Sequence, residues 1–179
     1  MSDEVQELKR QFLEDDVLLL TLQGALATRN QSSPVYGLGV SDREKELLKT
    51  SIREKLWQIG RRYIAVVSES DHIHNIERLA SDLTDAFGDI LDAGKFRIGI
   101  AQKLLNLYLK YCWALGWIPE PPHCPFDARI VRKLELTRRL SWAEIDTIEE
   151  YGILVSAAKD RAREVGLSIA HWELKKWPE

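Results

Sequence analysis

The sequence is poor in cysteine, and Cys112 and Cys124 are the only two. Two cysteines cannot build the disulfide framework of a small secreted domain, so that class of protein is excluded. No apolar run reaches the length that crosses a bilayer. The first ten residues, MSDEVQELKR, lack a basic region followed by a hydrophobic core, so we expect no signal peptide. These absences predict a cytoplasmic location and no membrane partner.

The sequence also lacks glycine-rich phosphate loops, since neither a Walker-type loop nor a dinucleotide-binding turn is present. The net charge of −3 has the wrong sign for strong non-specific DNA binding. This total hides an asymmetry between the two halves of the chain. Residues 1–93 hold 11 Lys and Arg against 17 Asp and Glu, whereas residues 94–179 hold 14 against 11. The second half is therefore mildly basic and permits an anionic partner.

The pattern that is present is the hydrophobic periodicity of helices. Apolar residues recur every three or four positions in residues 41–63 and again in residues 70–91. The one stretch of β-like composition, YIAVV at residues 63–67, is short and is interpreted as a connector. We therefore predict an all-α fold, a single compact helical domain over residues 1–179 with about six to eight helices.

Helix boundaries are indicated by capping residues. Glycine favours the position just after a helix, and Gly166 fits that role. Side chains that accept hydrogen bonds from the first helical turn are predicted at Ser2, at Ser41 with Glu44, at Asp127, at Ser141 with Glu144, and at Ser168.

The helix predicted at about residues 100–115 is apolar around nearly its whole circumference, which places it at the centre of the fold. One narrow line of residues, here called the polar stripe, is different: Gly99, Lys103, Asn106 and Lys110. Two interpretations stay open. The stripe is either a solvated face whose lysine stems cover apolar surface, or the floor of a pocket. An unpaired buried charge is costly, so a buried lysine needs a partner.

Asp127 follows a loop with four prolines, which restrict the backbone between the central helix and the next one. An aspartate in front of a helix is normally an N-cap. The rigid loop could also hold Asp127 across a cleft from Lys103. Both interpretations of Asp127 remain open at the level of sequence.

Two segments within residues 97–134, IGIAQKLLNLYLKY and PFDARIV, resemble the helix-hairpin-helix DNA glycosylase/lyase superfamily. The resemblance implies that the Lys103 amine attacks the sugar C1′ and that Asp127 assists proton transfer, with the target base flipped into a pocket. Two features depart from the family. Gly94 and Gly99 are farther apart than the glycines of its hairpin, and there is no cysteine cluster for an iron–sulfur site.

A cluster of cations follows Asp127. Arginine and lysine grouped in one short segment are typical of a surface that contacts phosphates, although a solvated face balanced by nearby glutamates is the alternative. The predicted nucleic-acid contacts are Lys110, Arg129, Arg132, Lys133, Arg138 and Arg139.

The histidines and cysteines show no metal-ligand spacing, so we predict neither a metal site nor a cofactor. His72 and His74 lie two residues apart on a predicted helix and point to different faces. We expect the histidines to be surface or capping groups, Cys112 to lie in the core and Cys124 to pack in its loop.

Two functions are consistent with these patterns. The first is a nucleic-acid-directed protein, in its sharper form a glycosylase/lyase that uses Lys103 and Asp127 on DNA. The second is a non-catalytic helical module that binds a protein partner. The second function predicts a shallow pocket and an exposed apolar patch.

Overall fold

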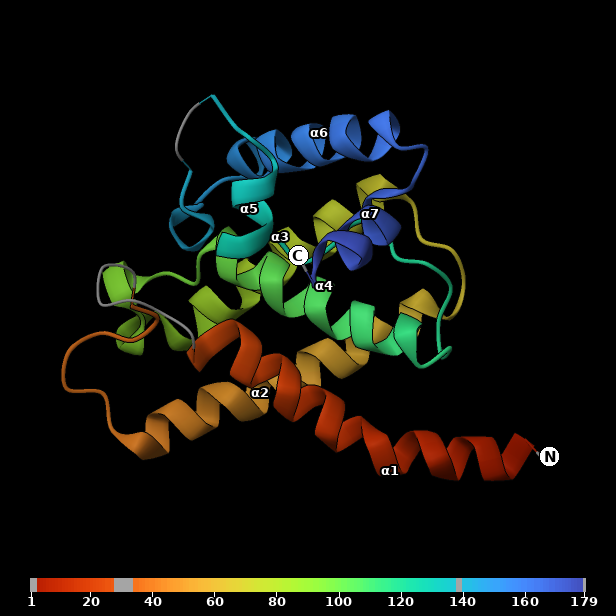
Figure 1. Ribbon diagram of the computed structural model, residues 1–179. Coiled ribbons are helices and arrows are strands. Elements are labelled where there is room, and N and C mark those ends of the chain that lie inside the picture. The colour runs from red at the N-terminus through yellow and green to blue at the C-terminus, as the bar shows by residue number, and fades with distance from the viewer. Residues whose placement is uncertain (1–2, 28–33, 138–139, 179) are drawn as a thin grey trace.

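Helix α4 (Ile98–Ala114) runs through the middle of the computed structural model, and the other helices pack around it (Figure 1). The structure describes residues 3–27, 34–137 and 140–178. In Figure 1, α1 (Asp3–Leu22) and α2 (Asp42–Gly60) lie on one side of α4, and α5 (Ala128–Lys133), α6 (Ile148–Glu164) and α7 (Ile169–Lys176) lie on the other. Helix α3 (Glu69–Phe87) packs directly against α4.

Short helical turns connect these elements. A π-helical turn, η1 (Gln23–Ala27), extends α1, and the remaining turns are the 3-10 segments η2 (Arg61–Ile64), η3 (Gly88–Ile90), η4 (Asp92–Gly94) and η5 (Trp142–Glu144). The described residues contain one isolated β-bridge, between Tyr36 and Leu91, and no strand. The all-α fold is confirmed, and the described residues form seven α-helices, within the predicted range.

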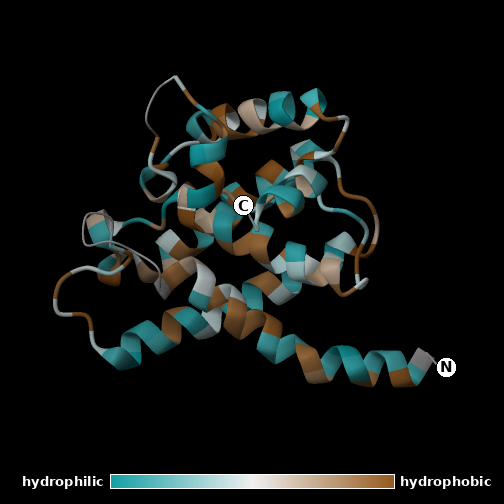
Figure 2. Cartoon of the chain, viewed as in Figure 1, coloured by the Kyte–Doolittle hydropathy of each residue, from teal (hydrophilic) through white to brown (hydrophobic). Residues whose placement is uncertain are grey.

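The core is built from the apolar faces that the sequence periodicity predicts. Leu104, Leu105 and Leu109 of α4 are fully buried, and α4 packs against both α2 and α3. Each such side chain stabilises the fold by about 1.5 to 3 kcal/mol. Figure 2 shows apolar residues concentrated where the helices meet. Within the described ranges, no helix combines the length and the apolar character that a membrane span requires.

Most of the predicted helix caps are present. Ser41 and Glu44 form a capping box, in which the Glu44 amide donates to Ser41 Oγ at 3.3 Å and the Ser41 amide donates to Glu44 Oε2 at 2.8 Å. Ser168 caps α7, and Gly166 follows α6 with a φ of 67°. Ser2 lies outside the described residues.

The helix predicted to begin after Ser141 begins later, so that prediction is wrong. Helix α6 starts at Ile148, and Thr147 is its N-cap, accepting a hydrogen bond from the Glu150 amide at 3.2 Å. The residues after Ser141 form η5 instead, and η5 packs against the start of α4. This tertiary contact outweighs the local capping signal.

Gly99 makes that contact possible. Its amide, one of the first-turn donors that α4 cannot satisfy internally, donates to the Ile145 carbonyl at 2.9 Å. A Cβ atom at position 99 would collide with the backbone carbonyl of Trp142. Only glycine lets the two backbones approach this closely.

Replacing Gly99 with alanine is therefore expected to lower the free energy of unfolding by about 2 to 3 kcal/mol, because backbone atoms have to move apart. Gly152 provides a matched control. It lies inside α6, and a Cβ there meets no atom within 4 Å. Gly152→Ala should raise the free energy of unfolding by roughly 0.5 to 1 kcal/mol. Urea denaturation of both variants measures the difference, and equal effects of the two would contradict the close approach at Gly99.

Candidate functional site

The polar stripe of α4 faces the C-terminal segment, residues 140–178. Lys103 is 6% exposed, and its ammonium lies 4.4 Å from the centre of the Trp142 ring. Asn106 is fully buried and donates to the Tyr151 hydroxyl at 3.2 Å. The Lys103 ammonium is attracted to the face of the Trp142 ring by the ring quadrupole. The interpretation of the stripe as a solvated face is therefore wrong, because protein covers it.

Lys110 ends the stripe with a largely buried ion pair. Its ammonium lies 2.7 Å from Glu173 Oε2, and the Glu173 residue is 1% exposed. Burial raises the pKa of the Glu173 carboxyl, while the hydrogen bond from Lys110 opposes that rise. The same ammonium lies 4.7 Å from the centre of the Trp177 ring. Lys110 therefore neutralises Glu173 and holds α7 against α4.

Asp127 acts as the N-cap of α5. Its Oδ1 atom accepts hydrogen bonds from the amides of Arg129 at 2.9 Å and Ile130 at 3.0 Å. The capping interpretation is confirmed. A carboxylate that accepts two backbone hydrogen bonds is held in place, and its negative charge suits the start of a helix.

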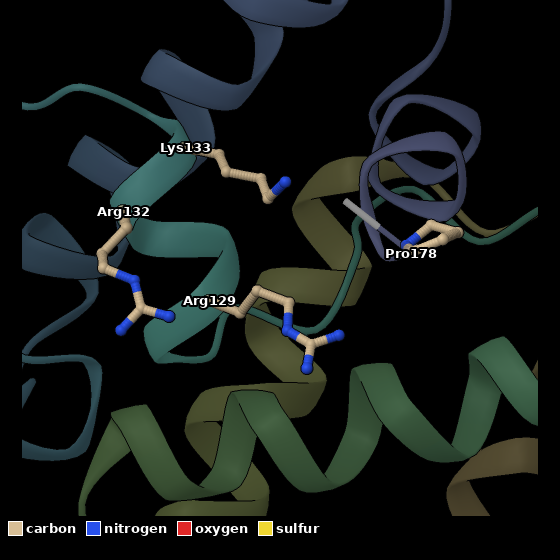
Figure 3. Close-up of a pocket in the computed structure, with 4 residues that line it drawn as sticks. All are labelled: Arg129, Arg132, Lys133 and Pro178. Carbon is tan, nitrogen blue, oxygen red and sulfur yellow. The ribbon is translucent and has the colours of Figure 1, made fainter.

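A basic pocket lies beside α5 and is lined by Arg129, Arg132, Lys133 and Pro178 (Figure 3). Its volume is about 340 Å³. Arg132 and Lys133 follow Arg129 by three and four residues, so each is a neighbour of Arg129 on the surface of the short helix. Figure 3 shows Arg129 and Lys133 extending from α5 towards the C-terminal turn that carries Pro178. The pocket thus joins two segments that are distant in sequence.

Arg129 fixes the wall of the basic pocket. Its Nη1 donates to the Trp177 carbonyl at 2.8 Å, and its guanidinium carbon lies 4.7 Å from the centre of the Trp177 ring. Among the residues that the structure describes, no carboxylate pairs with Arg132. Arg138 and Arg139, also predicted to contact nucleic acid, lie outside the described residues.

A second polar cluster, which the sequence did not predict, lies inside the protein. His72 and His123 are 0% and 1% exposed, and their rings meet edge to face with centres 4.7 Å apart. The expectation that the histidines are surface or capping groups is wrong for these two. It is confirmed for His74 and His171, which are exposed.

Each buried histidine is held by a tyrosine, and each tyrosine by an asparagine. Asn75 donates to the Tyr63 hydroxyl at 3.2 Å, which leaves that hydroxyl to donate to His72 Nδ1 at 2.7 Å. In the same way, Asn106 donates to the Tyr151 hydroxyl at 3.2 Å, and that hydroxyl lies 2.8 Å from His123 Nδ1, to which it donates. This assignment places the ring proton of both histidines on Nε2.

Burial keeps both rings neutral. It lowers the pKa of His72 to about 3 and that of His123 to about 4, and repulsion from His123 adds to the effect at His72. Glu69 partly offsets the shift at His123, since its Oε1 lies 3.4 Å from His123 Nε2. Glu69 also pairs with Lys159 at 2.6 Å, so the cluster reaches solvent at this end.

One sequence signal could have found this cluster. His72 and Asn75 occupy the same helical face as the buried Ile76 and Leu79, so two polar residues interrupt an apolar stripe. Polar residues on a buried face need partners. Their partners come from other segments of the chain, so the residue spacing within α3 could not identify them.

The two cysteine thiols lie inside the protein. Cys112 and Cys124 are buried and unpaired, as predicted, and burial raises the pKa of both thiols, that of Cys112 to about 11. A thiol of raised pKa is a poor nucleophile. Among the described residues, no group of three or more His, Cys, Asp or Glu side chains could hold a metal ion.

Comparisons with protein-family models, with curated proteins and with solved structures gave no match. Function is therefore inferred from the geometry of the basic pocket and of the polar stripe.

The buried histidines predict a loss of stability in acid. An unfolded histidine titrates near 6.5, while His123 in the folded protein titrates near 4. Between these values only the unfolded state takes up the proton, so stability is present above about pH 6.5 and falls as the pH is lowered. Each such histidine contributes a slope of about 1.4 kcal/mol per pH unit.

His123→Gln should reduce the slope of unfolding free energy against pH between about 6 and 4.5 by up to this amount. An unchanged slope in urea titrations would contradict the buried neutral state.

Proposed function

We propose that the protein binds the phosphate backbone of a nucleic acid through the basic pocket. The observation that carries the proposal is the grouping of Arg129, Arg132 and Lys133 around one cavity. Guanidinium groups bind phosphate oxygens in a bidentate manner, and lysine adds a compact positive charge. Phosphate contacts of this kind supply most of the affinity of proteins for nucleic acid without reading the base sequence.

The position of the charges supports a local mode of binding. The chain as a whole carries a net charge of −3, so it does not attract a polyanion over its whole surface. The acidic α1 and the basic α5 lie on opposite sides of α4 (Figure 1). A nucleic acid strand is therefore expected to approach the α5 side, with a small number of phosphate contacts and a correspondingly modest dependence on salt.

The surroundings of Lys103 and Asp127 favour binding without lyase chemistry. A nucleophilic lysine has to reach the sugar C1′ of its substrate, but Lys103 is covered by Trp142. Asp127 already accepts two amide hydrogen bonds. We therefore assign the recognition of nucleic acid to the basic pocket and a structural part to these two residues.

Substitution of the pocket cations tests the proposal. Arg132→Gln should weaken binding of a short labelled oligonucleotide by about tenfold, the equivalent of about 1.4 kcal/mol for one charged hydrogen-bonded contact. The slope of log affinity against log salt should fall by about 1. Fluorescence anisotropy at several salt concentrations measures both quantities.

Arg163→Gln is the matched control, since Arg163 is an exposed arginine of α6 that pairs with Asp160 at 2.9 Å. It should bind the oligonucleotide as the wild type does. If Arg132→Gln and Arg163→Gln bind equally well, or if the wild type does not bind at all, the proposed function is wrong.

Borohydride trapping distinguishes binding from lyase activity. A lyase forms an imine between its lysine and the abasic sugar, which borohydride reduces to a stable adduct. With an oligonucleotide that contains an abasic site, we expect no adduct that depends on Lys103. An adduct formed by the wild type and lost in Lys103→Gln, with thermal unfolding unchanged, would restore the lyase interpretation.

A further inference from the structure

A second cavity, here called the α1–α2 groove, lies away from the basic pocket. Its volume is about 410 Å³, and its lining residues come from α1, η1, α2 and the connection that contains Tyr36. Helices α1 and α2 lie on one side of α4, and α5 lies on the other (Figure 1). Cavities of about 300 to 1,000 Å³ are typical of sites for small molecules. Phosphate binding at the basic pocket makes no use of this groove.

The wall of the groove formed by α1 and η1 is mainly apolar. Leu19 of α1 is 43% exposed, whereas Leu22 is 3% exposed, so this wall extends from the surface towards the core. Leu26 of η1 continues the wall, and Gln23 is its polar member. A ligand with an apolar body that covers these side chains removes apolar surface from water, which favours binding.

The π-helical turn η1 holds the apolar wall in place. It packs against α4, and a Cβ atom at Gly24 would lie 2.7 Å from the Leu107 side chain, so the two elements are in close contact. Ala25, the next residue of η1, is fully buried. Single π-helical turns are rare and occur frequently at functional sites. The core therefore fixes this wall, as in a preformed ligand site.

The opposite wall, formed by α2, is cationic. Lys45, Lys49 and Arg53 line it at intervals of four residues, so they lie on one side of α2. Glu46 also lines this wall. Three positive charges against one negative charge leave a net charge of +2 along about 12 Å of helix. The groove thus has one apolar wall and one wall that attracts an anion.

Arg53 is the cation of this wall that is best placed to bind a ligand. Lys49 Nζ lies 2.6 Å from Glu46 Oε1, and its hydrogen bond and charge lower the pKa of the Glu46 carboxyl, so this pair neutralises itself. Lys45 pairs with the exposed Asp42 at 3.1 Å, and such surface pairs are weak. Within the described part of the chain, no carboxylate forms an ion pair with Arg53, which is half-buried.

A ligand that suits both walls has an apolar body and one anionic head. A neutral apolar molecule provides no partner for the Arg53 guanidinium, and a phosphate of a nucleic acid does not cover the leucines. A carboxylate accepts two parallel hydrogen bonds from a guanidinium.

We propose that the α1–α2 groove binds a fatty acid. The acyl chain lies along Leu19, Leu22 and Leu26, and the carboxylate accepts hydrogen bonds from Arg53. This site is independent of phosphate binding on the α5 side.

Calorimetric titration with decanoate, at concentrations at which decanoate is monomeric, tests the proposal. We expect saturable binding of a single decanoate to each chain. Decanol has the same chain without the charge and should bind about tenfold more weakly, because it forms no charge-assisted pair with Arg53. Equal affinities for decanoate and decanol, or binding without saturation, overturn the proposal.

Two substitutions test the two walls separately. Arg53→Gln should weaken decanoate binding by about tenfold and leave decanol binding unchanged. Leu19→Asp, a change at an exposed position, should abolish binding of both ligands with an unchanged circular dichroism spectrum. Arg43→Gln is the matched control, because Arg43 is exposed on α2 and does not line the groove. Equal effects of Arg53→Gln and Arg43→Gln overturn the proposal.

The same titrations separate this site from other occupants and from the basic pocket. If the groove instead receives a helix of a protein partner, the wild type binds decanoate no better than Leu19→Asp does, and this result overturns the proposal. Arg132→Gln should bind decanoate as the wild type does, and loss of binding in Arg132→Gln overturns the proposal as well. Failure of nucleic-acid binding and failure of fatty-acid binding are therefore separate results.

Discussion

Four contacts along one face of α4 determine how the second half of the protein is arranged. Gly99 donates to a backbone carbonyl, Lys103 lies against an indole ring, Asn106 donates to a tyrosine hydroxyl, and Lys110 pairs with a carboxylate. All four partners belong to the C-terminal segment. Buried polar groups are costly without partners, so this face accepts only one placement of that segment.

The basic pocket depends on this placement. Its outer wall is the C-terminal turn with Pro178, which Lys110 and Arg129 hold through their contacts with Glu173 and Trp177. The polar stripe thus supports a surface that it does not line. Lys110, which the sequence suggests for phosphate contact, instead lies against Trp177, whose ring and carbonyl contact Arg129. Lys103, which the sequence suggests for chemistry, lies against Trp142.

The sequence predicts those features that depend on neighbouring residues. The helices, their apolar faces and the caps at Ser41, Asp127 and Ser168 follow from local spacing. The features that were missed depend on partners distant in the chain. The segment after Ser141 forms a turn because Gly99 admits its backbone. The Nδ1 atoms of the buried His72 and His123 find their partners in Tyr63 and Tyr151, which lie in other segments of the chain.

The contacts of the polar stripe also bear on the order in which the chain folds. Asn106 and Tyr151 are 45 residues apart, and Lys110 and Glu173 are 63 residues apart. Contacts of such large sequence separation close long loops, whose entropy is lost before the contact is gained. The pairs α2–α3 and α3–α4 are consecutive in the chain, so their packing closes only short loops. We therefore expect the C-terminal segment to join a preformed helical layer, and the basic pocket to exist only after it has joined.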